Sequence, residues 1–292
     1  MDMIGNETYG KGGIMFTKVQ LFYILILLIF LLIVVIDSTR LKIKQYSIAS
    51  KKVTGNIRIA LITDLHSCYY GENQRVLINA INDQNPDIVL MGGDICDDKI
   101  PNDNTELLLK GIADRYPCFY VTGNHEYWSR DMKAILNLFK AYDVNILEGT
   151  YHTIEVKGQT LNICGISDPV ATIHTNKEFG VEQQLKSLEH VHKNGYYTVL
   201  LTHRPEAIQQ YKQYHFDLVL AGHAHGGQWR IPGILNGLYA PNQGLFPKYA
   251  GGKYTCGNTL MIVSRGLARE NTFVPRIFNR PELVIVNLLQ ES

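Results

Sequence analysis

The sequence predicts an α/β domain built around a mixed β-sheet. Short apolar runs rich in β-branched residues recur from Ile57 onward, and helix-like stretches separate the early ones. Strands that alternate with helices favour a layered α/β fold. Residues 145–165 are instead predicted to contain a hairpin that turns at Lys157-Gly158. We therefore expect antiparallel as well as parallel neighbours in the sheet.

The chain begins with a segment whose composition differs from the rest. Residues 19–36 carry no charge and only one strongly polar side chain, Gln20. As a helix they would reach about 27 Å, close to a hydrocarbon core of roughly 30 Å. A cleaved signal peptide is disfavoured because no small-x-small cleavage site follows. We expect a tail over residues 1–18, a transmembrane anchor over 19–36, a basic juxtamembrane linker over 37–55 and the globular domain over 56–292.

Charges around this segment predict which side of the membrane the domain faces. Two basic residues precede the segment and five follow it, namely Lys11 and Lys18, then Arg40, Lys42, Lys44, Lys51 and Lys52. The positive-inside rule therefore favours a cytoplasmic domain on a single-pass membrane protein, with an extracytoplasmic domain as the open alternative. The 5 cysteines lack disulfide-framework spacing, which fits a reducing compartment.

Overall charge argues against a polyanionic partner. Lys and Arg number 28 and Asp and Glu number 27, which gives a formal charge of +1. Nucleic-acid binding usually needs a clear excess of positive charge, so we expect no nucleic-acid partner. The sequence does not predict an oligomeric state.

Polar side chains with metal-ligand chemistry follow five predicted strands at the point where each strand ends. They are Asp64 and His66, then Asp94, Asn124, His203, and finally His223 with His225. Ligands gather beyond the carboxyl ends of the strands in open α/β sheets, so the five clusters can converge. In an extended chain residues i and i+2 project to one side, so each D-x-H or H-x-H pair can reach one ion or two adjacent ions. Any one cluster alone would also fit a cap or turn.

One long segment interrupts the alternation of strands and helices. Residues 226–257 are dense in glycine, proline and aromatic residues and show no period. A loop of that length in a compact domain is usually functional or disordered, and its aromatic content favours an ordered flap.

The motifs "DLH", "GDICD", "GNHE", "THRPE" and "GHAHGG" occur in this order and resemble those of the calcineurin-like metallophosphoesterases. The resemblance covers roughly Ile57 to the C-terminus, with Ala224 where the family commonly has threonine. It implies a four-layer αββα sandwich with mixed sheets. The later motifs "KYAGGKY", "SRGLA" and "RPEL" are similar to the membrane-anchored phosphodiesterase subgroup, which includes enzymes of the UDP-2,3-diacylglucosamine pyrophosphatase type.

The resemblance implies a centre of two divalent metal ions. One ion would be held by Asp64, His66 and His225, the other by Asn124, His203 and His223, and Asp94 would bridge the two. A shell of imidazole, carboxylate and amide groups without cysteine suits Mn, Fe, Co or Zn.

The same resemblance implies roles for three further residues. His125 would be free to protonate or stabilise the leaving oxygen of a substrate. Asp97 would orient His125, with a helix-entry cap as the alternative. Arg265 would contact a phosphate or else stabilise the fold. The neighbouring Glu126 is expected to organise its turn rather than to react.

The function implied is a metal-dependent phosphodiesterase or pyrophosphatase that cleaves a lipid-linked or nucleotide-lipid phosphate ester through a metal-bridging hydroxide. The expected partners are a membrane bilayer and a small phosphodiester or lipid-linked substrate. Two alternatives remain open, a phosphomonoesterase acting on proteins or nucleotides and a non-catalytic membrane-tethered scaffold.

Overall fold

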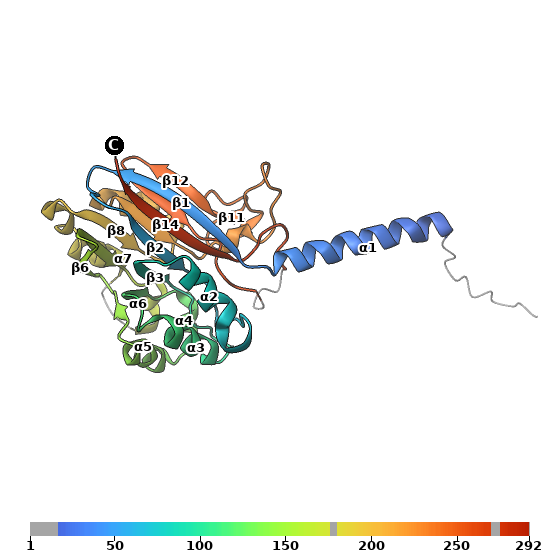
Figure 1. Ribbon diagram of the computed structural model, residues 1–292, viewed down its shortest axis with the longest axis horizontal. Coiled ribbons are helices and arrows are strands. Elements are labelled where there is room, and N and C mark those ends of the chain that lie inside the picture. Colours follow the sequence, from blue (N-terminus) through green and yellow to red (C-terminus); the bar gives the residue numbers. More distant parts are fainter. Residues whose placement is uncertain (1–16, 176–179, 270–274, 292) are drawn as a thin grey trace, which may run out of the picture.

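Two stacked β-sheets form the centre of the protein (Figure 1). The computed structural model describes residues 17–175, 180–269 and 275–291. In order across the first sheet lie β1 (Lys42–Ser50), β14 (Glu282–Gln290), β2 (Ile57–Ile62), β3 (Ile88–Gly92), β4 (Cys118–Val121) and β5 (Asn145–Ile146). Across the second lie β12 (Gly252–Cys256), β13 (Thr259–Val263), β9 (Leu218–Ala221), β8 (Tyr197–Leu201), β7 (Gln159–Gly165) and β6 (Thr150–Val156).

Helices cover the outer faces of both sheets. The first sheet packs against α2 (Arg75–Asp83), α3 (Asp103–Ile112) and α5 (Met132–Ala141), and the second against α7 (Val181–Ser187) and α8 (Ile208–Tyr211). Two further helices are α4 (Asn124–Trp128) and α6 (Val170–Thr175). Short 3-10 turns lie at Glu72–Gln74, Val191–Asn194, Pro205–Ala207, Lys212–Tyr214 and His225–Gly227. The layers therefore follow the predicted αββα order.

The central core explains why the inner strands carry long apolar runs. Side chains of β2 alternate, so that Ile59 and Leu61 pack between the sheets and Ala60 and Ile62 pack under the helices. Because both faces of the sheet are covered here, consecutive positions from residue 59 to 62 are apolar. Strand β14 runs antiparallel to β2, whereas β2, β3 and β4 are parallel, which confirms a mixed sheet.

The predicted hairpin is confirmed. Strands β6 and β7 pair antiparallel, from Thr150 opposite Gly165 to Val156 opposite Gln159. The two turn residues have φ of 51° at Lys157 and 75° at Gly158. Positive φ at both central positions is what a tight two-residue hairpin turn requires.

The predicted linker over residues 37–55 differs from the structure, because it contains strand β1. This strand runs parallel to β14 over its whole length, with Lys42 opposite Glu282. Its side chains alternate, and Ile48 is buried against the core. The lysines of this strand obscure the alternation of its side chains in the sequence, and the strand was therefore not predicted. The predicted tail over residues 1–18 lies outside the described residues except for its last two.

The prediction of a transmembrane anchor over residues 19–36 has to be corrected. Helix α1 (Lys18–Ser38) projects from the body of the protein (Figure 1). Within the described parts of the chain, no helix is long and apolar enough to cross a membrane. The anchor and the membrane localisation predicted from it are therefore wrong. Gln20 and Asp37 limit the unbroken apolar run to residues 21–36, which measures about 24 Å against roughly 30 Å of hydrocarbon.

We expect Phe139→Ala to lower the free energy of unfolding by about 3–5 kcal/mol. Phe139 of α5 is fully buried, and its ring stacks on that of Tyr120 with centroids 3.8 Å apart. Urea denaturation measures the change. Lys133→Ala on the exposed side of the same helix is the control, with an effect within about 0.5 kcal/mol. Equal effects of the two variants would show that α5 is not part of the core.

Candidate metal centre

Seven predicted ligand residues meet where strands of the two sheets end. Asp64 and His66 follow β2, Asp94 follows β3 and Asn124 opens α4 directly after β4. His203 follows β8 of the second sheet, and His223 and His225 follow β9. His203 also joins the sheets, because its Nδ1 lies 2.9 Å from the carbonyl oxygen of Gly92. The five motifs therefore come together at one edge of the sandwich.

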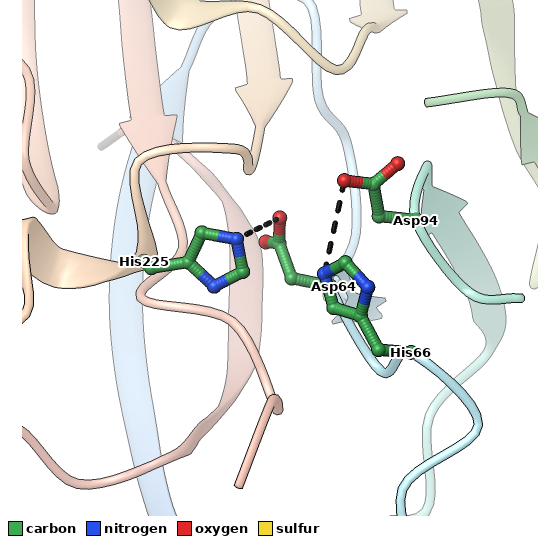
Figure 2. A group of neighbouring side chains, drawn as sticks. All are labelled: Asp64, His66, Asp94 and His225. Atoms are coloured by element: carbon green, nitrogen blue, oxygen red, sulfur yellow. Dashed lines mark ion pairs between the residues drawn. The ribbon is translucent and has the colours of Figure 1, made fainter. Parts of the chain in front are cut away.

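One group of side chains has the geometry of a metal site (Figure 2). Ligand atoms of Asp64, His66, Asp94 and His225 all lie within 4.8 Å of one another. His66 Nε2 is 3.7 Å from Asp94 Oδ2, and His225 Nε2 is 3.7 Å from Asp64 Oδ1. All four residues are buried. Two imidazoles and two carboxylates at these separations can surround a single divalent cation.

A second group shares Asp94 with the first. Asp94, His203 and His223 also place one ligand atom each within 4.8 Å of the others. His203 Nε2 lies 3.1 Å from Asp94 Oδ2 and 3.1 Å from His223 Nδ1. Asp94 is thus the one residue common to both groups, as a bridging ligand must be.

The ligand loops have an unusual backbone. Asp64, His66, Asp94, His223 and His225 have φ between 46° and 65°. These values are left-handed and rare for residues other than glycine. The prediction of an extended backbone at these positions is therefore wrong. The pairs nevertheless contribute as expected, because Asp64 and His66 share one group whereas His223 and His225 fall into different ones.

Main-chain hydrogen bonds hold these loops in place. The amide of His66 donates to the carbonyl of Asp94 at 2.9 Å, and the amide of Asp64 donates to that of Gly93 at 3.0 Å. Small residues allow the close approach. A Cβ on Gly222 would lie 2.6 Å from Asp64 Oδ2, and one on Gly123 would overlap Asp94. We conclude that these two glycines are required by the packing of the ligand loops.

Glu126 organises its turn, as the sequence analysis expected. Its carboxylate accepts the amides of Gly123 at 2.8 Å, Asp94 at 3.0 Å, Ile95 at 2.7 Å and Cys96 at 3.1 Å. Burial and the nearby charge of Asp94 raise the pKa of Glu126 to about 7. The hydrogen bond from the amide of Gly123 acts in the opposite direction and lowers this pKa, but it is the smaller effect. Because it binds four main-chain amides, three of them at residues 94–96, Glu126 fixes the loop that carries Asp94.

Unpartnered polar atoms show that the group of side chains fits metal ions. Asp64 Oδ2, His66 Nε2 and Asn124 Oδ1 are buried and have no hydrogen-bond partner among the described residues. A buried polar atom without a partner costs about 1–3 kcal/mol. Three such atoms in one place are best explained by cations that they would coordinate.

Two of the clustered histidines favour the protonated form in the metal-free protein. Burial disfavours the charged form of His203, but the charge and hydrogen bond of Asp94 outweigh it and raise its pKa to about 10. At His66 the effect of burial is likewise outweighed by the hydrogen bond with Asp97 and by the charge of Asp94, so its pKa is raised. Asp94 is correspondingly held as a carboxylate, with its pKa well below the usual range in spite of burial.

The other two histidines are neutral. Burial, with the neighbouring charges of His203 and Arg204, lowers the pKa of His223 well below its usual range. Burial, with the charges of His66 and Arg276, does the same at His225. Neutral imidazoles are the form that binds metals. His223 and His225 are therefore in the form that can bind a metal ion. His203 and His66 would first have to lose a proton.

His125 lies beside the cluster and is more open than the predicted ligands. Its side chain is 24% exposed, and its ring stands edge-on to that of His66 at 4.4 Å between centroids. Its Nδ1 is 2.7 Å from Asp98 Oδ1 but 3.5 Å from Asp97 Oδ2. Asp98 is thus the nearer partner of His125, and the sequence analysis missed it.

Asp97 contacts a predicted ligand instead. Its Oδ2 lies 3.0 Å from His66 Nδ1, and its Oδ1 accepts the amides of Lys99 and Ile100 at 2.8 and 3.0 Å. A carboxylate on the far nitrogen of a metal-binding histidine fixes the orientation of the ring. The alternative, a helix-entry cap, does not match the structure, because these two amides lie in a bend and α3 begins only at Asp103.

Arg265 does not reach the cluster. Its guanidinium donates to Asn236 Oδ1 at 2.6 Å and to the carbonyl of Gly251 at 3.2 Å. The side chain is buried and lies 3.9 Å from Glu282. This geometry supports the fold-stabilising alternative for Arg265 rather than contact with a substrate phosphate.

Another arginine lies next to the cluster and was not predicted. Arg204 Nη1 is 2.8 Å from His223 Nε2, and Asp168 holds the same guanidinium through Nε at 2.5 Å and Nη2 at 3.0 Å. Arg204 stands in the "THRPE" motif directly after His203, which was the only available signal. Asn242, 2.8 Å from His223 Nε2, carried no signal because it comes from the irregular segment 226–257.

Stacked mixed sheets with a cluster of histidine, aspartate and asparagine side chains at one edge are the fold and the kind of site expected of a metal-dependent phosphoesterase family. Residues 57–227 match the family model of the calcineurin-like phosphoesterases, and the chain belongs to this family. Members of the family use a dinuclear centre of divalent metal ions, for which the chain has candidate ligand clusters. Proteins to which the chain is similar are named metallophosphoesterases.

Known proteins support this assignment. An uncharacterized metallophosphoesterase of Helicobacter pylori is 32% identical over 193 residues, which are 65% of this chain and 50% of the relative. The uncharacterized metallophosphoesterase YkuE of Bacillus subtilis is 26% identical over 238 residues, 79% of this chain and 78% of the relative. The chain thus spans about half the length of the first relative. The sulfate thiohydrolase SoxB of Thermus thermophilus shares the fold, with a TM-score of 0.50 at 14% identity over 74% of this chain and 53% of SoxB.

We expect metal binding to release protons. Because the pKa of His203 is about 10 without metal, Mn²⁺ that binds at pH 7 must displace roughly one proton from this ring, and the affinity should fall as the pH is lowered. Calorimetric titration in two buffers of different ionisation enthalpy counts the protons. His203→Gln should lower the count by about one, whereas His152→Gln, at an exposed site, should not change it. Identical heats in both buffers would contradict the expectation.

Proposed function

We propose that this chain hydrolyses a phosphodiester or diphosphate bond in a substrate that carries a lipid or another apolar group, including substrates of the nucleotide-lipid type. The observation that carries the proposal is the convergence of seven potential ligand residues from five strand ends, with unpartnered buried atoms on Asp64, His66 and Asn124. We propose residues 56–292 as the catalytic unit.

In this proposal Asp64, His66 and His225 hold one divalent ion, Asn124, His203 and His223 hold the other, and Asp94 joins the two. Two such metal ions would supply an activated water and neutralise the charge of the phosphoryl oxygens. The chain contributes the orientation of the ligands. Asp97 fixes the ring of His66, and Glu126 fixes the loop of Asp94.

His125 is proposed to act on the leaving oxygen. It is the partly exposed imidazole of the site, and its Nδ1 is held by Asp98, which leaves the opposite nitrogen for a substrate. A proton held there stabilises an alkoxide or phosphate as it departs. No covalent intermediate on the nearby Cys96 is part of the proposal, because burial raises the pKa of this thiol well above its usual range.

The segment after His225 supports an apolar substituent in the substrate. Ile234 is 85% exposed, Leu245 66% and Phe246 67%, although all three belong to the ordered segment 226–257. Leu245 lies opposite the exposed Tyr239 in the β10–β11 pair and is followed by Phe246, and neighbouring exposed apolar side chains can mark a binding surface. The +1 net charge gives no support to a nucleic-acid substrate.

A substrate comparison tests the proposal. The full chain is treated with a chelator, and Mn²⁺, Zn²⁺, Co²⁺ and Fe²⁺ are then restored one at a time. We expect turnover to return with metal and bis-p-nitrophenyl phosphate to be cleaved faster than p-nitrophenyl phosphate. Faster cleavage of the monoester would favour a phosphomonoesterase. Absence of turnover with every metal would favour a binding scaffold.

Replacement of the shared carboxylate should abolish activity without unfolding the protein. Changes to residues that merely support metal ligands cost about 10- to 100-fold, so Asp94→Asn should reduce kcat/KM by more than about 100-fold. It should also reduce the bound metal measured by mass spectrometry to one ion or fewer. Asp143→Asn, in an exposed turn with a similar backbone, is the matched control. An active Asp94→Asn with two ions bound would refute the bridging role.

A further inference from the structure

We propose that Asn242 is a positioning residue for His223. Its amide oxygen accepts the Nε2 proton of the imidazole and thereby keeps Nδ1 turned toward the metal site. This inference rests on the proposed ligand role of His223 and deepens it. It links the hairpin of β10 (Tyr239–Ala240) and β11 (Gly244–Leu245) to one half of the metal centre.

The ring orientation of His223 is the first step. Its Nδ1 lies 3.1 Å from His203 Nε2, and that nitrogen lies 3.1 Å from Asp94 Oδ2. Nδ1 therefore faces the ligand cluster, and Nε2 faces away from it. A nitrogen that binds a metal carries no proton, so the proton of the neutral ring must sit on Nε2.

Among the described residues, the groups that contact Nε2 include one acceptor for this proton. Asn242 Oδ1 and Arg204 Nη1 both lie 2.8 Å from Nε2. A guanidinium has donors only, so Arg204 cannot accept the proton. The amide oxygen of Asn242 has two lone pairs, and Arg204 Nη1 also contacts it. Asn242 can therefore accept from both donors and allow the cation to lie beside the imidazole.

Arg204 cannot move away from this contact easily. Asp168, which is 1% exposed, binds its guanidinium through two hydrogen bonds, and the hydroxyl of Tyr211 donates to its carbonyl at 2.9 Å. If Asn242 were lost, two donors would face each other at a fixed short distance. The imidazole would then have to turn, which would move Nδ1 out of the cluster.

Local chemistry suits asparagine at this position. Asn242 has φ of 59° in the turn between the two hairpin strands, where Tyr239 pairs with Leu245. Asparagine tolerates this left-handed backbone better than most residues, and glycine tolerates it fully. The turn thus serves both to close the hairpin and to present the amide to His223. Ion binding and order in the hairpin should consequently favour each other.

Metal titration of the full chain tests the inference. Asn242→Gly removes the acceptor without backbone strain, and Asn242→Asp keeps an acceptor oxygen at the same place. Asn236→Gly is the control, because it removes another side-chain amide of the same segment, one that bonds Arg265 and Gly251 rather than a histidine. Each protein is titrated with Mn²⁺ and followed by calorimetry and by the electron paramagnetic resonance signal of coupled ions.

We expect Asn242→Gly to weaken one of the two ions by about 10- to 100-fold and to lose the coupled signal, with the other ion changed less than about threefold. Asn242→Asp should restore the second ion, and Asn236→Gly should bind as the unmodified chain does. Hydrogen exchange over residues 239–245 should slow on metal binding in the unmodified chain but not in Asn242→Gly.

Two results would overturn the inference while the proposed function stands. These are full binding of both ions by Asn242→Gly, and an equal loss in Asn236→Gly, which would mean that loosening of the segment is the cause. An unmodified chain that binds fewer than two ions would instead refute the dinuclear centre and this inference together.

Discussion

The buried carboxylate of Asp94 is the interaction on which the rest of the site depends. It lies 3.1 Å from His203 of the second sheet and 3.7 Å from His66 of the first, and its Oδ1 accepts the amide of His125 at 2.9 Å. A buried charge of this kind costs several kcal/mol unless opposite charges or hydrogen bonds surround it. The sandwich meets this requirement by bringing loops from both sheets to one carboxylate, so that the ligand geometry and the stacking of the sheets have the same cause.

A second requirement follows from how close these loops come. Five of the seven potential ligands have left-handed backbones, which each cost of the order of 1 kcal/mol for residues with a side chain. Such conformations persist only where the surroundings fix them. Four amides held by Glu126 and the space left by Gly123 provide this restraint. The strain is therefore confined to the rim, while the apolar strands beneath supply the stability.

The sequence predicted well the features that follow from where a residue stands along a strand. Apolar strands with polar ends, such as β2 followed by Asp64, predict both the sheet and the convergence of ligands. The sequence predicted poorly the features that depend on side-chain orientation or on contacts between residues far apart in the chain. Asp97 and Asp98 are adjacent, and spacing alone cannot show which one reaches His125. Asn242 meets His223 only because a hairpin folds back, and β1 was missed because its lysines conceal an alternating pattern.

The contact between His203 and Asp94 offsets part of the free-energy cost of burying that carboxylate. His203 pairs with Asp94 as a cation would, and this contact raises the folded-state pKa of the imidazole to about 10, above the ordinary value near 6.5. The stabilisation from this pair is fully present below that ordinary value and is lost as the pH rises through about 10. Protonated His203 thus supplies a positive charge beside the buried carboxylate of Asp94. A divalent ion that displaced this proton would bring two positive charges in place of one, which is why binding of the ion should become weaker as the pH falls.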